Sequence, residues 1–297
     1  MYQQKILLDT DIGSDIDDCI TLSYLLAQPE CELVGITTVT GEPHKRASLA
    51  DWICSFAQKD IPVFPGNARA LDGSNRQPDA PLASVVNNND KHFPENCHIE
   101  FMRETICNNP GEITLLGIGP LTNIAELFTV DPGIPYLLKK LVIMNGIFYH
   151  QLPGLENFHC EWNASVDPKA ASIVYKARVP DHQSIGMDVT CQVMMNKDEA
   201  RKRFKLPLLE NILPVFDNFT YHRNITFHDP LAALTIFHDI CQFRSGFVEV
   251  ETRNEEFAGK TVLKEHSPTR HQVAFSVDTV LFFKKFFETF HAFSLKK

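Results

Sequence analysis

Short apolar runs alternate with helix-like stretches along the first two thirds of the chain. The apolar runs occupy residues 5–9, 33–41, 61–66, 113–119, 141–146 and 184–190. Helical patterns between them occupy residues 18–28, 44–58, 121–128 and 168–177. Strands that alternate with helices predict right-handed crossovers and a mainly parallel sheet. The sequence therefore predicts an α/β fold, with an open and mainly parallel sheet flanked by helices on both faces.

The pattern changes after residue 190. A capping-box sequence at residues 196–199 predicts a helical region that extends to about residue 220. Two β-like stretches follow at residues 246–252 and 260–265, after a further helix. The last helix, at residues 278–293, places five phenylalanines on one face, which predicts docking on the core. No linker or repeat divides the chain, so a single domain over residues 1–297 is expected.

Residues 69–98 form the one long stretch that a core does not explain. They are polar and rich in Asn and Pro. Loops of more than about 15 residues are uncommon unless they bind ligands, cover a site or are disordered. Because this stretch follows the end of a predicted strand, we expect a lid or substrate loop over the ligand site.

Composition and charge narrow the classes of function. The chain has 297 residues and a net charge of −9, which argues against nucleic acid or an anionic membrane as its main partner. No apolar run reaches the roughly 18 residues of a membrane span. The eight cysteines are scattered and the start lacks signal-peptide features, so reduced thiols and a cytoplasmic location are expected.

Five carboxylates within ten residues follow the first apolar run. They are Asp9, Asp11, Asp15, Asp17 and Asp18. Like charges at contact distance raise one another's pKa, so a cation is expected among them. Oxygen ligands alone favour a hard divalent ion such as Ca²⁺ or Mg²⁺. The alternative is a solvated acidic turn, in which Asp17 and Asp18 only favour a helix N-terminus.

A second informative segment contains His228, Asp229 and Pro230. A helix N-cap at Asp229 followed by proline at the first helical position would by itself explain Asp229 and Pro230. In the functional interpretation, the helix N-terminus holds the Asp229 carboxylate in place, and His228 donates a proton near neutral pH.

Glu161 and Asn163 form a third candidate group, because they flank Trp162. In an extended segment both polar side chains would face the same way. One carboxylate and one amide on a common face suit a pair of vicinal hydroxyls. Asp167, which precedes Pro168, is explained as a helix cap.

Taken together, these segments resemble the inosine-uridine preferring nucleoside hydrolase family. The resemblance runs along most of the chain. It rests on the segments at residues 9–18, 35–41, 61–66, 119–123, 161–163, 166–168, 186–190 and 228–231. The N-terminal aspartate cluster combined with His-Asp-Pro-Leu at residues 228–231 is its most specific part.

The resemblance implies a nucleoside-hydrolase fold, one bound Ca²⁺ and a homodimer or homotetramer. It also implies the metal ligands, which are Asp11, Asp18, the backbone carbonyl of Thr122, and Asp229. Calcium accepts six to eight oxygens, so these groups leave room for a water and two ribose hydroxyls.

The reaction implied is hydrolysis of the N-glycosidic bond of a ribonucleoside, with formation of ribose and free base. Asp11 would take the proton of a metal-polarised water, and His228 would donate to the departing base. Asp17, Glu161 and Asn163 would bind the sugar hydroxyls.

Several positions depart from the family pattern. Glu42 follows Gly41 where many members carry an amide, which adds a carboxylate to the expected substrate-binding set. Asn145 replaces a glycine, and Asp15 is an additional carboxylate. Residues 76–79 stand where a His-Gly loop is expected. The metal and sugar side matches the family pattern, with Asp15 as a further candidate for a ligand or contact role, whereas the base side does not match, which leaves the accepted base open.

Two alternatives compete with this interpretation. One is a phosphohydrolase of the haloacid-dehalogenase type, with Asp9 as nucleophile, Asp11 as acid–base and Mg²⁺ as the metal. The other is a catalytically altered protein that keeps the hydrolase fold and binds nucleoside or ribose without cleaving it.

Overall fold

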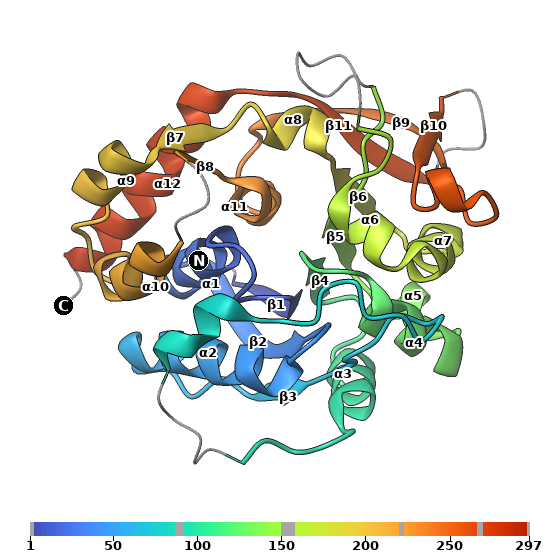
Figure 1. The fold of residues 1–297 in the computed structure, drawn as a ribbon, viewed down its shortest axis with the longest axis horizontal. Coiled ribbons are helices and arrows are strands. Elements are labelled where there is room, and N and C mark those ends of the chain that lie inside the picture. Colours follow the sequence, from blue (N-terminus) through green and yellow to red (C-terminus); the bar gives the residue numbers. More distant parts are fainter. Residues whose placement is uncertain (1–2, 87–91, 150–157, 220–222, 266–269, 296–297) are drawn as a thin grey trace.

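A single large sheet runs through the molecule (Figure 1). The structure, a computed structural model, describes residues 3–86, 92–149, 158–219, 223–265 and 270–295. The large sheet has nine strands in the order β10-β9-β11-β6-β5-β4-β1-β2-β3. The seven strands from β11 to β3 pair in parallel, and β9 and β10 are added antiparallel at one edge. The predicted mainly parallel α/β sheet is confirmed.

The central strands of the large sheet are short and mostly buried, whereas β9 and β10 at one edge are largely accessible. Their bounds are β1 Gln4–Thr10, β2 Cys31–Thr38, β3 Val63–Pro65, β4 Ile113–Gly117, β5 Lys140–Met144, β6 His182–Ile185, β9 Cys241–Val250, β10 Thr261–Lys264 and β11 His271–Val277. A separate antiparallel pair consists of β7 Met194–Asn196 and β8 Asn224–Thr226.

The helices cover both faces of this sheet. Their bounds are α1 Asp17–Ala27, α2 Pro43–Phe56, α3 His98–Cys107, α4 Thr122–Val130, α5 Ile134–Leu137, α6 Trp162–Val166, α7 Pro168–Lys176, α8 Met187–Thr190, α9 Lys197–Arg203, α10 Leu213–Asn218, α11 His228–Leu234 and α12 Thr279–Ser294. Short 3₁₀ turns occur at Pro81–Val85, Glu210–Ile212 and Glu255–Phe257.

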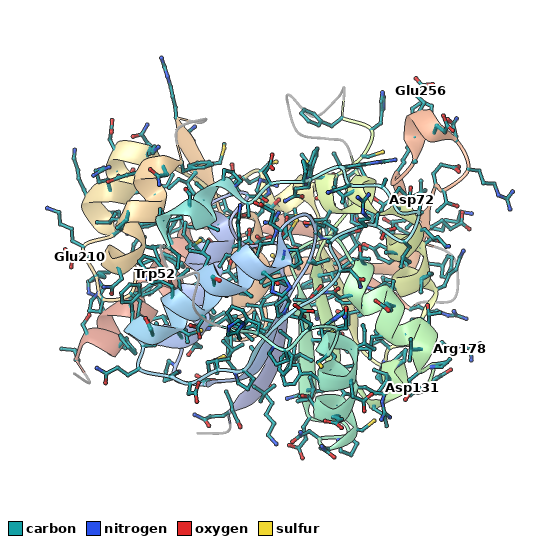
Figure 2. The ribbon with its side chains drawn as sticks, turned by 60° about the horizontal axis from the view of Figure 1, so that its bottom comes forward. Trp52, Asp72, Asp131, Arg178, Glu210 and Glu256 are labelled. Carbon is teal, nitrogen blue, oxygen red and sulfur yellow. The ribbon has the colours of Figure 1, made fainter. Side chains whose placement is uncertain are left out.

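Alternate residues of the central strands supply two separate cores. In β1, Ile6 and Leu8 belong to the core beneath α1, α2, α11 and α12, whereas Leu7 belongs to the core beneath α3, α4, α5 and α7. In β5, Val142 belongs to the first of these cores and Leu141 to the second. Since side chains alternate across a strand, a run that is apolar throughout requires helices on both faces. Charged side chains such as Arg178, Glu210 and Glu256 are exposed at the periphery of the molecule (Figure 2).

The final helix behaves as its sequence predicts. Phe282, Phe286 and Phe290 are completely buried, and Phe287 is nearly so. The ring of Phe286 stacks on that of Tyr24 in α1, with ring centroids 6.0 Å apart. The aromatic stripe is therefore core that joins α12 to α1.

The local predictions were partly wrong. Residues 184–190 do not form one strand, because β6 ends at Ile185 and the helix α8 begins at Met187. The helical region predicted after residue 196 is confirmed, and it consists of α9, a 3₁₀ turn and α10. The helix α3 and the strands β7, β8 and β11 were not predicted. Among the described residues, no helix has both the length and the apolar character needed to cross a membrane.

Candidate functional site

A cleft of about 790 Å³ opens at the carboxyl ends of the central strands. In an open α/β sheet this edge is where ligands bind. The lining includes carboxylates from the β1–α1 turn and α11, residues from the ends of β4 and β5, the segment 76–81 and residues from 158 to 165. The lining residues are Asp11, Ser14, Asp15, Asp17, Asp18, Arg76, Gln77, Pro78, Asp79, Pro81, Ile118, Met144, Phe158, Cys160, Glu161, Trp162, Asn163, Ser165, Met187, His228 and Asp229.

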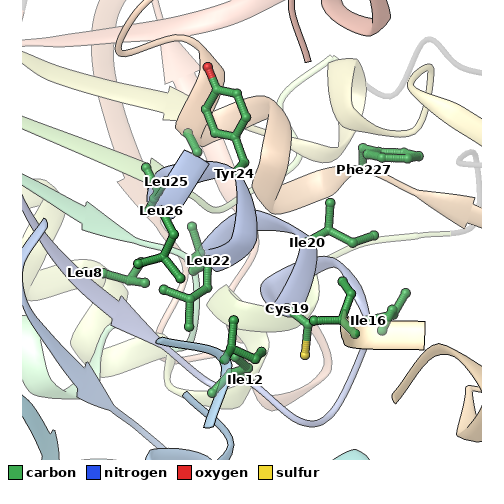
Figure 3. Close-up of a cluster of buried hydrophobic side chains, with 14 of the residues drawn as sticks. Leu8, Ile12, Ile16, Cys19, Ile20, Leu22, Tyr24, Leu25, Leu26 and Phe227 are labelled. Atoms are coloured by element: carbon green, nitrogen blue, oxygen red, sulfur yellow. The ribbon is translucent and has the colours of Figure 1, made fainter. Parts of the chain in front are cut away.

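The acidic turn is anchored by apolar residues placed between its aspartates. Ile12 and Ile16 are completely buried and join the core that surrounds α1 (Figure 3). Asp11, Asp15 and Asp17, their sequence neighbours, line the cleft. Burial of a whole Ile side chain contributes about 1.5–3 kcal/mol, so two such anchors resist rearrangement of the turn. The turn is therefore part of the core and not a solvated loop, which excludes the alternative interpretation of the acidic cluster.

Three carboxylates lie close enough together to hold a metal ion. Carboxylate oxygens of Asp17, Asp18 and Asp229 lie within 4.8 Å of one another, and all three residues are buried. Burial, together with repulsion between the carboxylates, raises the pKa of each well above its ordinary range. Three ionised carboxylates buried at this distance would repel one another strongly unless a cation lay between them. Because their ligand atoms are hard oxygens, the site fits a divalent cation of the Ca²⁺ or Mg²⁺ type.

Asp229 is not the helix cap that the sequence allowed. The helix α11 begins one residue earlier, at His228, and its cap position is Phe227, which makes no side-chain capping bond. The Asp229 backbone N–H donates to Oδ2 of Asp17 (3.2 Å). Its carboxylate faces the cluster because α11 packs beside α1. By contrast, Asp167 caps α7 through Ala170 N (2.9 Å), as predicted.

Arg46 supplies a cation beside the cluster, and it was not predicted. Its side chain is completely buried, and it donates to the carbonyl oxygens of Asp11, Ile12 and Thr40 and to Ser14 Oγ. The sequence contained a signal for the burial of Arg46. Leu49, Ala50 and Ile53 follow it by three, four and seven positions and therefore lie on the same face of α2, which is the buried face. A charged residue on the core face of an amphipathic helix indicates a buried polar partner.

Asp11 lies beside this cluster and has contacts of its own. Burial raises the pKa of Asp11, while Arg46 and a bond from the Gln77 amide oppose the rise. Gln77 Nε2 donates to Asp11 Oδ2 at 2.7 Å. A Cβ on Gly119 would lie 2.8 Å from Asp11 Oδ1, so only glycine allows the carboxylate to rest against this turn. No sequence signal indicated the contact with Gln77.

Glu161 and Asn163 reach the cleft by a different geometry from the predicted one. They do not lie in an extended segment, because Glu161 is the N-cap of α6 and accepts from Asn163 N (2.7 Å) and Ala164 N (3.0 Å). Burial raises the pKa of Glu161 to about 7. Asn163 Nδ2 donates to the carbonyls of Ile118 and Met144, both at 3.1 Å. Asn163 can therefore offer its Oδ1 acceptor to a ligand.

His228 lines the cleft and is held by one hydroxyl. Thr190 Oγ1 lies 2.6 Å from His228 Nδ1. Burial lowers the pKa of His228 to about 4, so the ring is neutral at neutral pH. If the Thr190 hydroxyl donates to Nδ1, the neutral ring carries its proton on Nε2 and can donate one hydrogen bond.

Some predicted residues are not brought into the cleft. Glu42 lines a smaller depression together with Lys45, which forms an ion pair with it (2.5 Å), and it also accepts from Ala80 N (3.2 Å). Thr122 is buried at the start of α4, where its hydroxyl donates to Asp167 Oδ2 (2.8 Å). Its carbonyl as a metal ligand stays a prediction.

Asn145 is completely buried and is not among the residues that line the cleft in the described part of the chain. The predicted lid, residues 69–98, includes positions 87–91, which lie outside the described residues. Its described part contributes residues 76–79 and 81 to the cleft wall, and its movement as a lid stays a prediction.

Comparison with known proteins identifies the family. Residues 6–284 match the sequence profile of the inosine-uridine preferring nucleoside hydrolases. The chain belongs to this family. It is therefore a nucleoside hydrolase, an enzyme of the N-glycosyl hydrolase class, and the phosphohydrolase alternative is wrong.

Individual relatives agree with this assignment. The chain is 30% identical to a non-specific ribonucleoside hydrolase, RihC, of Salmonella paratyphi C, over 92% of this chain and 93% of that protein. It is 28% identical to a probable uridine nucleosidase 1 of Oryza sativa subsp. japonica, over 85% of this chain and 83% of that protein. A purine-preferring ribonucleoside hydrolase from Gardnerella vaginalis shares the fold, with a TM-score of 0.83, 21% identity and coverage of 99% and 100%.

Proposed function

We propose that this nucleoside hydrolase cleaves ribonucleosides to ribose and free base with Ca²⁺ as its metal and Asp11 as the base that activates water. One observation carries the proposal. Asp11 lines the cleft beside the buried cluster of Asp17, Asp18 and Asp229, so a proton acceptor and a cation site open into one cavity. A cleft of about 790 Å³ falls in the range of about 300–1,000 Å³ that is usual for small-molecule sites.

Asp11, Asp18, Asp229 and the Thr122 carbonyl would hold the metal in this proposal. A bound divalent ion would supply positive charge among the carboxylates, orient the sugar diol and make a water more acidic. Two of these residues, Asp18 and Asp229, belong to the group of three buried, converging carboxylates, whose third member is Asp17, and Asp11 lines the cleft beside that group.

The residues of this chain account for the remaining steps. Asp11 accepts a proton from the water that adds to C1′ of the ribose, while the bond between C1′ and the base nitrogen breaks. Asp17 and Glu161 accept hydrogen bonds from sugar hydroxyls, and Asn163 accepts through Oδ1. The same anionic groups favour the positive charge that develops on the sugar ring.

The departing base needs a hydrogen bond or a proton. His228 is the donor in this proposal, and its lowered pKa makes it a neutral N–H donor rather than an imidazolium. Glu42 has no part in this arrangement, since its carboxylate forms an ion pair with Lys45 and accepts a hydrogen bond from Ala80 N. A cytoplasmic location and a homodimeric or homotetrameric state stay predictions.

Incubation of the protein with uridine, inosine and other common ribonucleosides tests the proposal. Two relatives are named as a probable uridine nucleosidase and a non-specific ribonucleoside hydrolase. Uridine is therefore the first substrate to assay. We expect free ribose and base in equal amounts with Ca²⁺, loss of turnover with a chelator and recovery when Ca²⁺ is returned. Binding of a nucleoside in calorimetry without ribose release would support the non-catalytic alternative instead.

A further inference from the structure

Gln77 makes a bridge between two parts of the cleft that are far apart in the sequence. Its side chain is 8% exposed, and its Nε2 donates to Asp11 Oδ2 (2.7 Å) and to Ser14 Oγ. Its Oε1 accepts from the indole Nε1 of Trp162 at 2.8 Å. The bridge therefore joins the turn after β1 to the helix α6.

The partners determine the orientation of the Gln77 amide. An indole nitrogen can only donate a hydrogen bond, and an ionised carboxylate can only accept one. With Trp162 on one side and Asp11 on the other, Oε1 has to face the indole and Nε2 the carboxylate. Glutamate could not donate to Asp11, and lysine or arginine could not accept from Trp162, so the amide matches both neighbours.

The backbone around Gln77 is braced against the acidic turn. A Cβ on Gly41 (φ +59°) would collide with the carbonyl oxygen of Gln77, so these two backbones touch only because residue 41 is glycine. Leu82 N donates to the Gly13 carbonyl (2.9 Å), and Arg46 Nη2 donates to the Asp79 carbonyl (3.1 Å). The bridge is thus attached to the same buried elements that hold Asp11.

We propose that Gln77 is a positioning residue for the hydrolytic reaction, and that it fixes the rotation of the Asp11 carboxylate through a bridge held by Trp162. The inference rests on the proposed function. With Oδ1 against Gly119 and Oδ2 held by Gln77, the Asp11 side chain has one defined orientation toward the cleft. Trp162 is 55% exposed and lines the cleft, so a ligand that touches its ring lies at a set place relative to Asp11.

The test compares Gln77→Met with a matched control, Gln28→Met. Gln28 is also a buried glutamine with a side-chain bond, to Tyr24 Oη (2.9 Å), and it follows the last residue of α1, outside the cleft lining. We expect kcat of Gln77→Met to fall about 10–100-fold, because small misplacement of a reacting group has costs of that order. KM should change less than about threefold, and Gln28→Met should keep the wild-type kcat.

Two substrates separate positioning of Asp11 from recognition of the base. Water activation is common to all substrates, so the fall in kcat should be equal on uridine and on p-nitrophenyl riboside. A loss on uridine alone, a rise in KM at unchanged kcat, or a wild-type kcat in Gln77→Met would each overturn the inference.

Gln77→Glu and Trp162→Phe test the bridge independently, so the test does not depend on whether Gln77→Met folds. Gln77→Glu keeps the acceptor for Trp162 but not the donor to Asp11, so it should lose kcat as Gln77→Met does. Trp162→Phe keeps Gln77 but not its orienting donor, and a smaller loss of about 3–10-fold is expected. Wild-type kcat in both would also overturn the inference.

Emission of Trp162 gives a readout that requires no turnover. The chain has two tryptophans, so Trp52→Phe leaves Trp162 as the single emitter. In that background Gln77→Met should shift the emission maximum, whereas Gln28→Met should not. An unchanged maximum in Gln77→Met would contradict the bridge itself. Absence of turnover by the wild type with every nucleoside would instead overturn the proposed function, and the positioning role with it.

Discussion

The two sides of the cleft are built from different kinds of structure. The acidic side comes from the turn after β1 and from the start of α11. Ile12, Ile16 and Arg46 fix the turn, and the apolar residues 231–234 of α11 belong to the same core. The opposite wall comes from the irregular segment 76–81 and from α6, where Phe158 and Trp162 are 49% and 55% exposed. The opposite wall thus combines exposed aromatic rings with the buried side chains of Gln77, Glu161 and Asn163, whereas the carboxylates that converge on the acidic side are all buried.

Removal of the proton acceptor on the acidic side should have the largest effect. Asp11→Asn is expected to lower kcat at least about 10³-fold, because the base and its charge are both lost. The circular dichroism spectrum should not change, since the side chain is close in size. The measurement is ribose release by a reducing-sugar assay, and a variant with full activity would show that another group activates the water.

The next largest effect concerns the leaving group. His228→Ala should lower kcat on uridine about 10²-fold, which is the order of loss when one hydrogen-bond donor to a developing charge is removed. On p-nitrophenyl riboside, whose leaving group needs no proton, the loss should be no more than a few-fold. Equal losses on the two substrates would mean that His228 acts on the sugar side and not on the base.

Arg46 tests whether the acidic side depends on its buried support. Arg46→Met leaves several buried carbonyl oxygens without a donor, and we expect a loss of about 3 kcal/mol or more in the free energy of unfolding. The midpoint of thermal unfolding should fall by about 5 °C or more. Arg103→Met, which removes a partly exposed arginine from α3, is the control and should shift the midpoint by less than about 1 °C.

The smallest expected effect is the pH dependence of the metal-free protein. Asp17, Asp18 and Asp229 have a pKa raised by burial, so their contribution to stability is complete below about pH 4, the unfolded value, and is lost as the pH rises through their folded values. Thermal unfolding with a chelator should therefore occur at a lower temperature at pH 8 than at pH 5.

Ca²⁺ should raise the unfolding midpoint more at pH 8 than at pH 5, because protons compete with the metal for the carboxylates. In Asp229→Asn both the pH dependence and the effect of Ca²⁺ should be smaller than in the wild type. The idea of a metal cluster would fail if Ca²⁺ left the wild-type midpoint unchanged at both values.

Local sequence was sufficient for the features that depend on neighbouring residues. Apolar runs and helical periods predicted the parallel sheet, and the capping sequence at Asn196 predicted the start of α9, whose N-cap accepts from Asp198 N (2.9 Å). Clustered aspartates with His228 and Asp229 predicted the family and the acidic part of the cleft. These signals are readable because helix periods, caps and turn carboxylates act within a few residues of one another.

Only the tertiary structure decided the contacts that join distant segments. Asp229 joins the cluster because α11 packs on α1, Arg46 reaches the acidic turn from α2, and Gln77 meets Trp162 across 85 positions. Glu42 was expected in the cleft and instead pairs with Lys45 beside it. Such contacts depend on how helices and strands pack together and on the path of the irregular segments. Packing and loop path do not produce a periodic pattern in the sequence.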